Sequence, residues 1–287
     1  MSEKKQTKLS ISSSSEKKIA YSFKEIKKTF TLTFAESGEN HKGMQIIGKP
    51  STEGYSLADL EKMKVWFESY GSTCELIHLN TLLNGFTLEK QVDDAYLLII
   101  KQGVNSILHP IKKTSYELFE EIDKIPKDSK AFMYGRVVEK KARHNLVFAD
   151  FDQEPEYEEG KGTVVNFNKV PLLDYIRCTL EKILDVKEQM ICEGNFYYDV
   201  SKCGIGFHGD AERFKVIGVR IGETMPLRYS WFYKHKAIGP HFDVQFDDGD
   251  MYVMSEKTTG NNWKKSSQYT LRHAAGSEKF ISLEKYQ

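Results

Sequence analysis

The residues best suited to chemistry lie in one short stretch, residues 195–212, which reads NFYYDVSKCGIGFHGDAE. It contains a His-X-Asp triplet, formed by His208 and Asp210. In an extended strand, residues two apart point to the same face, so this imidazole and this carboxylate could share a metal ion. A second imidazole from a distant strand would complete a facial triad of two histidines and one carboxylate. Such a triad leaves positions open on ferrous iron for a cosubstrate and dioxygen.

The triplet is a weak signal by itself, so the second imidazole has to be found. Three histidines follow Asp210. His235 lies in a charged turn and His241 follows a Gly-Pro pair, so both are expected in loops. His273 lies in a strand-like segment, residues 269–276, and a jelly roll would bring that late strand beside the early strand of His208. We therefore predict His273 as the third ligand.

The elements that must position these residues are mainly short strands. Beyond Asn195, six strand candidates are separated by Gly, Pro and Asp-Gly turns, a pattern typical of a β-sandwich or jelly roll. They are residues 216–221, 228–233, 242–246, 250–254, 269–274 and 279–283. Earlier in this part, residues 170–184 show helical periodicity after a well-placed Pro171. The expected fold class is α+β, with a C-terminal double-stranded β-helix (jelly roll) flanked by helices.

The first part of the chain predicts a different organisation. Residues 1–28 hold eight lysines against three glutamates, which indicates a basic flexible arm. Residues 29–125 read as a small α/β module of unknown role. It has strands at 29–34, 74–79 and 96–100, a helix at 56–71 that opens with a capping box, and a second helix at 114–125. The jelly-roll domain is expected to span residues 126–287.

Composition narrows the class of protein. The 41 Lys and Arg residues balance the 41 Asp and Glu residues, and 40% of the chain is hydrophobic, as expected of a soluble globular protein rather than a disordered one. No apolar run approaches the roughly 20 residues that a membrane span needs. The four cysteines are widely spaced, without a CxxC pair. We expect an intracellular protein of the cytoplasm or nucleus, neither secreted nor attached to a membrane.

From residue 131 onward the sequence resembles the AlkB-like iron(II)- and 2-oxoglutarate-dependent dioxygenases. That family has an Asn-X-Tyr pair, a glycine-rich turn and a His-X-Asp-X-Glu motif, followed by a Gly-Asp strand that ends in Met-Ser. The matching residues are Asn195, Tyr197, Gly204, Gly206, His208, Asp210, Glu212 and residues 249–255, with residues 134–136 and 142–144 resembling an earlier strand.

The resemblance implies a role for each matched residue. His208, Asp210 and His273 would bind Fe(II) and form the catalytic centre. Asn195 and Tyr197 would lie beside 2-oxoglutarate. Glu212 would lie on the substrate side of the pocket.

One departure from the family concerns the cosubstrate clamp. In the family, a strand after the distal histidine carries arginines that hold the carboxylates of 2-oxoglutarate. Only 14 residues follow His273, and none is arginine. We expect Lys279 to replace the first arginine as a point charge, with Arg272 as a second candidate. An alternative alignment places residues 269–272 on the arginine strand. It would leave no histidine for the distal ligand, and so predicts an inactive protein.

The implied activity is oxidative hydroxylation of a C–H bond by Fe(II), 2-oxoglutarate and O2. Relatives of this type often demethylate bases in DNA or RNA, as in DNA repair, and aromatic residues beside lysines at 231–234 and 263–265 suit contact with nucleic acid. The zero net charge and the acidic loop at 150–159 argue against it. The alternatives are a protein or small-molecule hydroxylase of the same fold, and a catalytically inactive jelly-roll binding protein.

Overall fold

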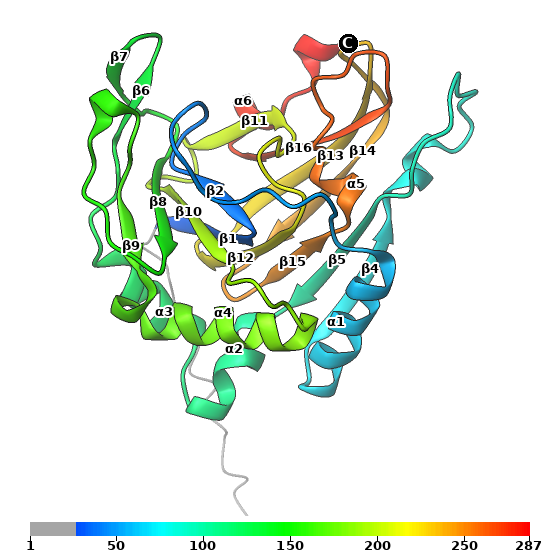
Figure 1. Ribbon diagram of the computed structural model, residues 1–287. Helices are drawn as coiled ribbons and strands as arrows, with labels where there is room; N and C mark the ends of the chain where they lie inside the picture. Colours follow the sequence, from blue (N-terminus) through cyan, green and yellow to red (C-terminus); the bar gives the residue numbers. More distant parts are fainter. Residues whose placement is uncertain (1–26) are drawn as a thin grey trace, which may run out of the picture.

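The computed structural model describes residues 27–287 (Figure 1). Residues 1–26 of the predicted basic arm lie outside the described residues. The helices of more than five residues are α1 (Leu57–Ser69), α2 (Gly103–Leu108), α3 (Ser115–Asp123) and α4 (Pro171–Leu184), and two single turns are α5 (Glu256–Thr259) and α6 (Glu278–Ile281). No helix in this part of the chain is long and apolar enough to cross a membrane.

Two antiparallel sheets dominate the architecture, which confirms the α+β class. The larger has eight strands in the order β4-β5-β15-β12-β1-β10-β8-β9, in which only the β8–β9 pair is parallel. Its strands are β1 (Thr29–Ala35), β4 (Thr73–His78), β5 (Tyr96–Lys101), β8 (His144–Ala149), β9 (Val164–Asn166), β10 (Ile191–Tyr197), β12 (Val216–Gly222) and β15 (Met251–Met254). The smaller sheet has the order β11-β16-β13-β14, with β11 (Gly204–His208), β13 (Met225–Tyr233), β14 (Lys236–Phe246) and β16 (Thr270–Gly276).

Two short hairpins complete the strands. One pairs β2 (Ser37–Glu39) with β3 (Ile46–Gly48), and the other pairs β6 (Lys130–Met133) with β7 (Arg136–Glu139). The first hairpin follows β1 directly, so it starts from the centre of the large sheet.

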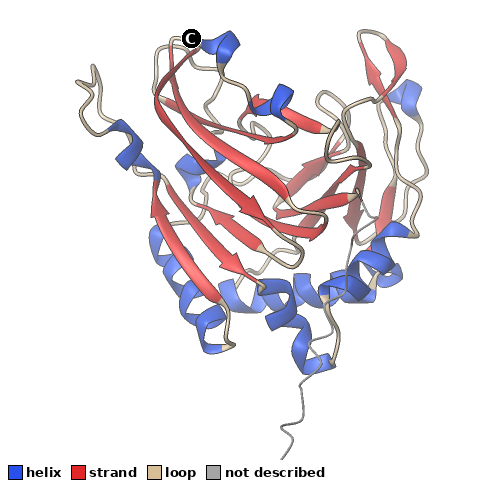
Figure 2. Ribbon diagram, turned by 180° about the vertical axis from the view of Figure 1, so that it is seen from behind, coloured by secondary structure: helices blue, strands red, loops and turns tan. Residues whose placement is uncertain are grey.

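The large sheet packs on both faces. Helices α1 to α4 cover one face, as Figures 1 and 2 show, and enclose the first core, in which side chains of α1, α3 and α4 meet those of β1 and β12. The small sheet covers part of the other face. The second core joins β12 and β15 of one sheet to β13 and β16 of the other. The molecule is therefore layered as helices, large sheet and small sheet.

Strand β1 explains why the predicted division of the chain is wrong. It lies between β12 and β10 in the middle of the large sheet, and β4 and β5 extend the same sheet beyond β15. The expected module at 29–125 and the expected domain at 126–287 therefore form one sheet. Sequence patterning identified each strand but not its partner, because pairing between distant strands leaves no local signal.

Several local expectations are confirmed. Helix α1 begins after Ser56, whose side chain accepts from the Asp59 N–H in a capping box, and α4 begins at Pro171. The strand expected at 279–283 is wrong, because β16 ends at Gly276, where the backbone has φ 113°, and the chain turns into α6. An L-residue with a side chain rarely adopts that φ, so Gly276 marks the turn.

We expect Leu32→Ala to destabilise the protein strongly. Leu32 is fully buried on the helix-facing side of β1, so its truncation leaves a cavity and should lower the free energy of unfolding by about 2–5 kcal/mol. Urea denaturation measures the change. The control is Val65→Ala on α1, where the side chain is 67% exposed and the effect should stay within about 0.5 kcal/mol. Equal effects of the two substitutions would contradict a central place for β1.

Candidate metal centre and cavity

The structure brings His208, Asp210 and His273 together. One ligand atom from each lies within 4.8 Å of the other two. The two histidines are paired across β11 and β16. Asp210 has one carboxylate oxygen 3.8 Å from His208 Nε2 and the other 3.8 Å from His273 Nε2. The predicted juxtaposition of the three side chains is thus confirmed.

The reason for that juxtaposition differs from the one expected. Strand β11 ends at His208, so Asp210 lies in the following loop and not on the same strand face. The Asp210 N–H donates to the Thr259 carbonyl at 2.9 Å, which turns the carboxylate back toward the histidines. Gly209 permits this path, because a Cβ atom there would lie 2.0 Å from the Gly260 carbonyl oxygen.

Burial sets the protonation of the three groups. It lowers the pKa of His208 to about 4, with a smaller contribution from His273, and it lowers the pKa of His273 to about 4 as well. Both imidazoles are therefore neutral near pH 7, which is the form that binds metals. The His208 Nδ1 atom lies 2.8 Å from the Gly206 carbonyl oxygen, so Nδ1 carries the proton and Nε2 presents its lone pair to the other two ligands. Burial also raises the pKa of Asp210, as expected of a carboxylate that needs a nearby cation.

Behind the triad lies a small cavity of about 50 Å³ between the sheets, lined in part by His208, Asp210 and His273 themselves. Its lining includes Thr31 and Thr33 from β1, Tyr197 from β10 and Tyr252 from β15. Tyr252 reaches this position by crossing β12 at Gly218, where a Cβ atom would lie 2.0 Å from the tyrosine ring. Tyr197, predicted to lie beside 2-oxoglutarate, thus lines the same small cavity as His208, Asp210 and His273.

Arg220 lines the same cavity and is the residue that sequence reasoning missed. It is 1% exposed, and its Nε and Nη1 atoms have no hydrogen-bond partner within the described chain. Burial lowers its pKa, yet an arginine keeps its charge under ordinary conditions. A buried cation without an acceptor is costly, so this end of the cavity is suited to an anion. The available signal was an arginine inside the otherwise apolar strand VIGVRIG, residues 216–222.

The two residues predicted to clamp the cosubstrate lie elsewhere. Lys279 is exposed on α6, with its Nζ atom 4.9 Å from the centre of the Phe280 ring. Arg272 points to the opposite side of β16 from His273, because neighbouring strand residues alternate. Its guanidinium lies 4.3 Å from the ring centre of Phe232. Neither lines the cavity behind the triad.

Asn195 also has a different environment from the one expected. Its Oδ1 atom accepts from Arg143 Nε at 2.6 Å and from Asn145 Nδ2 at 2.7 Å, and its Nδ2 atom donates to Glu193 at 2.9 Å. The amide is held by protein partners and does not line the cavity behind the triad. In this structure Asn195 orders the neighbouring Arg143 and Glu193.

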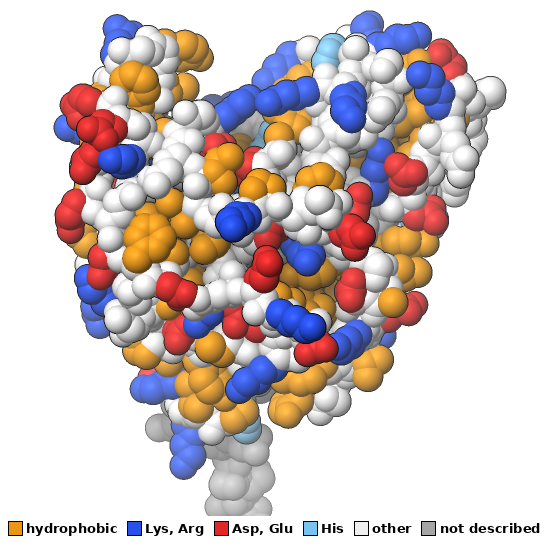
Figure 3. Space-filling model, viewed as in Figure 1, with side chains coloured by type: hydrophobic (Ala, Val, Ile, Leu, Met, Phe, Trp, Pro, Cys, Tyr) orange, Lys and Arg blue, Asp and Glu red, His pale blue; other side chains and the backbone are white. Residues whose placement is uncertain are grey.

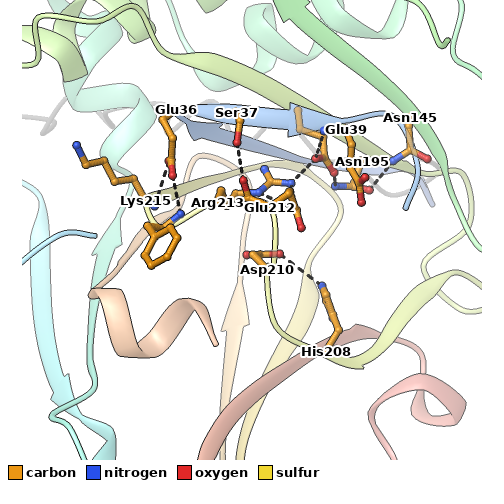
Figure 4. Close-up of polar contacts among 12 residues, drawn as sticks. Glu36, Ser37, Glu39, Asn145, Asn195, His208, Asp210, Glu212, Arg213 and Lys215 are labelled. Carbon is orange, nitrogen blue, oxygen red and sulfur yellow. Dashed lines mark hydrogen bonds and ion pairs between the residues drawn. The ribbon is translucent and has the colours of Figure 1, made fainter. Parts of the chain in front are cut away.

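A second, open cavity of about 560 Å³ lies on the other side of the triad. Glu212 lines it, as predicted, together with Glu39 from β2 and Trp263 from the loop after α5. Arg213 joins Glu193 to Glu212: its Nη2 atom donates to Glu193 and, at 2.6 Å, to Glu212, as Figure 4 shows in part. No local pattern in the sequence indicated Glu39 or Glu193, because strand pairing brings both to the cavity.

Glu39→Gln should change the pH dependence of stability. Burial and the charges of Glu212 and Glu193 raise the Glu39 pKa from 4.5 to about 7. A carboxyl whose pKa is higher in the folded state stabilises the fold fully below pH 4.5, and this contribution is lost as the pH rises through 7. We expect the variant to gain roughly 1–3 kcal/mol over wild type between pH 5 and pH 8, after allowance for partial exposure.

Urea denaturation at pH 5, 6, 7 and 8 measures that difference. Glu53→Gln, at an exposed position of the same segment, is the control and should give a constant difference from wild type. A Glu39→Gln difference that does not grow with pH would show that the carboxyl is ionised throughout this range.

The chain is similar in sequence to a viral protein. No model of a known protein family matches it. Over 257 residues it is 47% identical to the uncharacterized protein R156 of Acanthamoeba polyphaga mimivirus, a match that spans 90% of this chain and 99% of the viral protein. The chain therefore belongs to the same protein family as this mimivirus protein.

Proposed function

We propose that the protein is an Fe(II)- and 2-oxoglutarate-dependent dioxygenase of the AlkB-like type, which hydroxylates a C–H bond of a methylated nucleic-acid base. The observation that carries the proposal is the convergence of two neutral imidazoles and one carboxylate where a small cavity adjoins a larger one. The small cavity, which Arg220 lines, suits an anionic cosubstrate, and the larger one suits a substrate that enters from solvent.

The proposed fold is a double-stranded β-helix, or jelly roll, made by the two facing antiparallel sheets. The triad lies on β11, on β16 and in the loop after β11. The position that a further C-terminal strand would fill between β12 and β10 is held by the N-terminal strand β1. With β1 in that position, the proposed jelly roll is complete without a further strand after His273, the strand that would have carried the arginines.

The residues present fit the proposed cofactors. The three ligands are of the types that ferrous iron takes, and His208 and His273 need no deprotonation near pH 7. Arg220 would hold the far carboxylate of 2-oxoglutarate, and the Tyr197 phenol lines the same space. An arginine is well suited to this task because its guanidinium binds a carboxylate through two parallel hydrogen bonds.

Bound iron, 2-oxoglutarate and O2 would together supply the oxidising power to hydroxylate a C–H bond, with release of succinate and carbon dioxide. The chain's own residues place the reactants and exclude water. Apolar side chains of the core between the sheets, among them Leu227 and Met254, line the small cavity and would limit the water around the cosubstrate. An N-methyl group hydroxylated in the open cavity would then lose formaldehyde and leave the demethylated nitrogen.

The choice of a nucleic-acid base rests on the mouth of the open cavity. Trp263 lines it, with Lys42 Nζ 5.1 Å and Lys264 Nζ 5.7 Å from the centre of a ring of its indole. An aromatic face beside two lysines suits a stacked base and its phosphates. Basic and acidic side chains are interspersed on the face in Figure 3, so recognition would depend on these local contacts rather than on a broad basic field.

Arg220→Met should separate cosubstrate binding from metal binding. Loss of the guanidinium should weaken 2-oxoglutarate binding by about 30-fold or more, because the far carboxylate would be buried without a partner. Metal affinity should persist, and the ligand-free protein should become more stable because an unpaired buried charge is removed. The measurement is an anaerobic titration with Fe(II) and 2-oxoglutarate, followed by the visible charge-transfer band.

Two further variants complete that titration. His273→Ala should abolish the band, and Lys279→Ala, at an exposed site, should leave it unchanged. A wild-type protein without the band would overturn the proposed activity. A band weakened by Lys279→Ala but not by Arg220→Met would instead assign the clamp to the lysine.

The substrate is tested with oligonucleotides that each carry one methylated base. Wild type should form succinate and formaldehyde in equal amounts, and Trp263→Ala should raise KM about 5- to 100-fold through loss of base stacking. Tyr70→Ala, 53% exposed near the end of α1, is the aromatic control and should not change KM. Turnover of methylated peptides alone would contradict a nucleic-acid substrate.

A further inference from the structure

The loop that carries Asp210 is held by its backbone and not through the carboxylate. Within residues 27–287, the Asp210 carboxylate accepts no hydrogen bond, and its nearest ionisable neighbours are the two histidines at 3.8 Å. Because no hydrogen bond orients this side chain, the position of its carboxylate depends on the position of the Asp210 backbone. The segments that fix residues 209–215 therefore decide where the metal-binding carboxylate lies.

Two consecutive residues at the corner between β1 and β2 form hydrogen bonds with this loop, as Figure 4 shows. The Glu36 carboxylate accepts from the Phe214 N–H at 2.6 Å and from the Lys215 N–H at 3.1 Å. The Ser37 hydroxyl, fully buried, donates to the Glu212 carbonyl at 2.7 Å. These contacts are made across about 175 residues of sequence.

The Glu36 carboxylate also forms a hydrogen bond with a third segment of the chain. It accepts from the Ser51 N–H at 3.1 Å, so one side chain joins the β1–β2 corner, the segment after β3 and the loop after Asp210. On the far side of the loop, Asp210 itself is held by Thr259 and Gly209 by the close approach of Gly260. The loop is thus fixed from both ends, once by the N-terminal segment and once by the turn after α5.

We propose that Glu36 and Ser37 are positioning residues for the metal ligand Asp210, and that presenting this ligand is a function of the N-terminal segment. The proposal rests on the proposed metal centre. Glu36 touches neither the metal ligands nor the cavities, and it acts by holding the backbone N–H groups of the loop. Groups that orient metal ligands in this indirect way commonly change metal affinity by 10- to 100-fold when removed.

The test is the affinity of the full-length, metal-free protein for Co(II), followed by the visible absorption of the bound ion. Glu36→Ala should weaken Co(II) binding about 10- to 100-fold and alter the shape of the absorption bands at saturation. Glu36→Gln keeps one acceptor oxygen and should have a smaller effect. Ser37→Ala should also weaken binding, because it frees the Glu212 carbonyl.

Two controls separate positioning from general stability. Glu53→Ala removes an exposed carboxylate of the same segment and should leave the Co(II) affinity within twofold of wild type. Leu60→Ala removes a fully buried side chain of α1 and should lower the melting temperature without changing the affinity or the bands.

The possible outcomes are distinct. If Glu36→Ala and Ser37→Ala lower only the melting temperature, as Leu60→Ala does, the two residues are structural and the inference is wrong. If wild type binds no Co(II), the proposed metal centre fails, and the inference fails with it. Weakened binding with altered bands in the Glu36 and Ser37 variants alone would establish the positioning role.

Discussion

Burial of charged and polar groups without local partners is the constraint on which this structure depends. His208, His273 and Asp210 meet between two sheets, and Arg220 lies nearby with two of its nitrogens unpaired. Each group would be more stable in water, so the fold must provide enough packing elsewhere to hold them. The helix-covered core and the core between the sheets supply that packing on either side of the large sheet. In the proposed complex, a bound cation and a bound anion would offset this cost.

Acidic and basic groups meet where the two cavities adjoin. Arg220 and two tyrosines line the small cavity, Glu39 and Glu212 line the open one, and Glu193, Arg213, His208 and Asp210 line both. In the proposed reaction the anionic cosubstrate would meet Arg220, and the substrate would meet carboxylates that hydrogen bonds already order. Side chains that are ordered before the substrate binds need less reorganisation during the reaction.

The N-terminal segment contributes to both sides of this arrangement. Its strand β1 supplies Thr31 and Thr33 to the small cavity and buries Phe30, Leu32 and Phe34 against the helices. The corner that follows contacts the loop of Asp210, and the next hairpin brings Glu39 to the open cavity. A segment that reads as a separate module in the sequence is therefore an integral part of the site.

The sequence by itself determined the local elements and the three residues of the candidate metal centre. The alternation of TFTLTF predicted β1, the Ser56 capping box predicted the start of α1, and the spacing of His208 and Asp210 with a strand-borne His273 predicted a triad that the structure brings together. Each of these signals is local, because hydrophobic periodicity, helix capping and residue type can be recognised within a few neighbouring residues. What only the tertiary structure decided was the pairing of β1 between β12 and β10, and with it the roles of Glu36, Glu39 and Arg220. Lys279 and Arg272 were chosen as clamp candidates by nearness in sequence to His273, and neither lines the cavity behind the triad. The cavity is instead lined by residues that distant strands bring together, and sequence distance carries no information about such contacts.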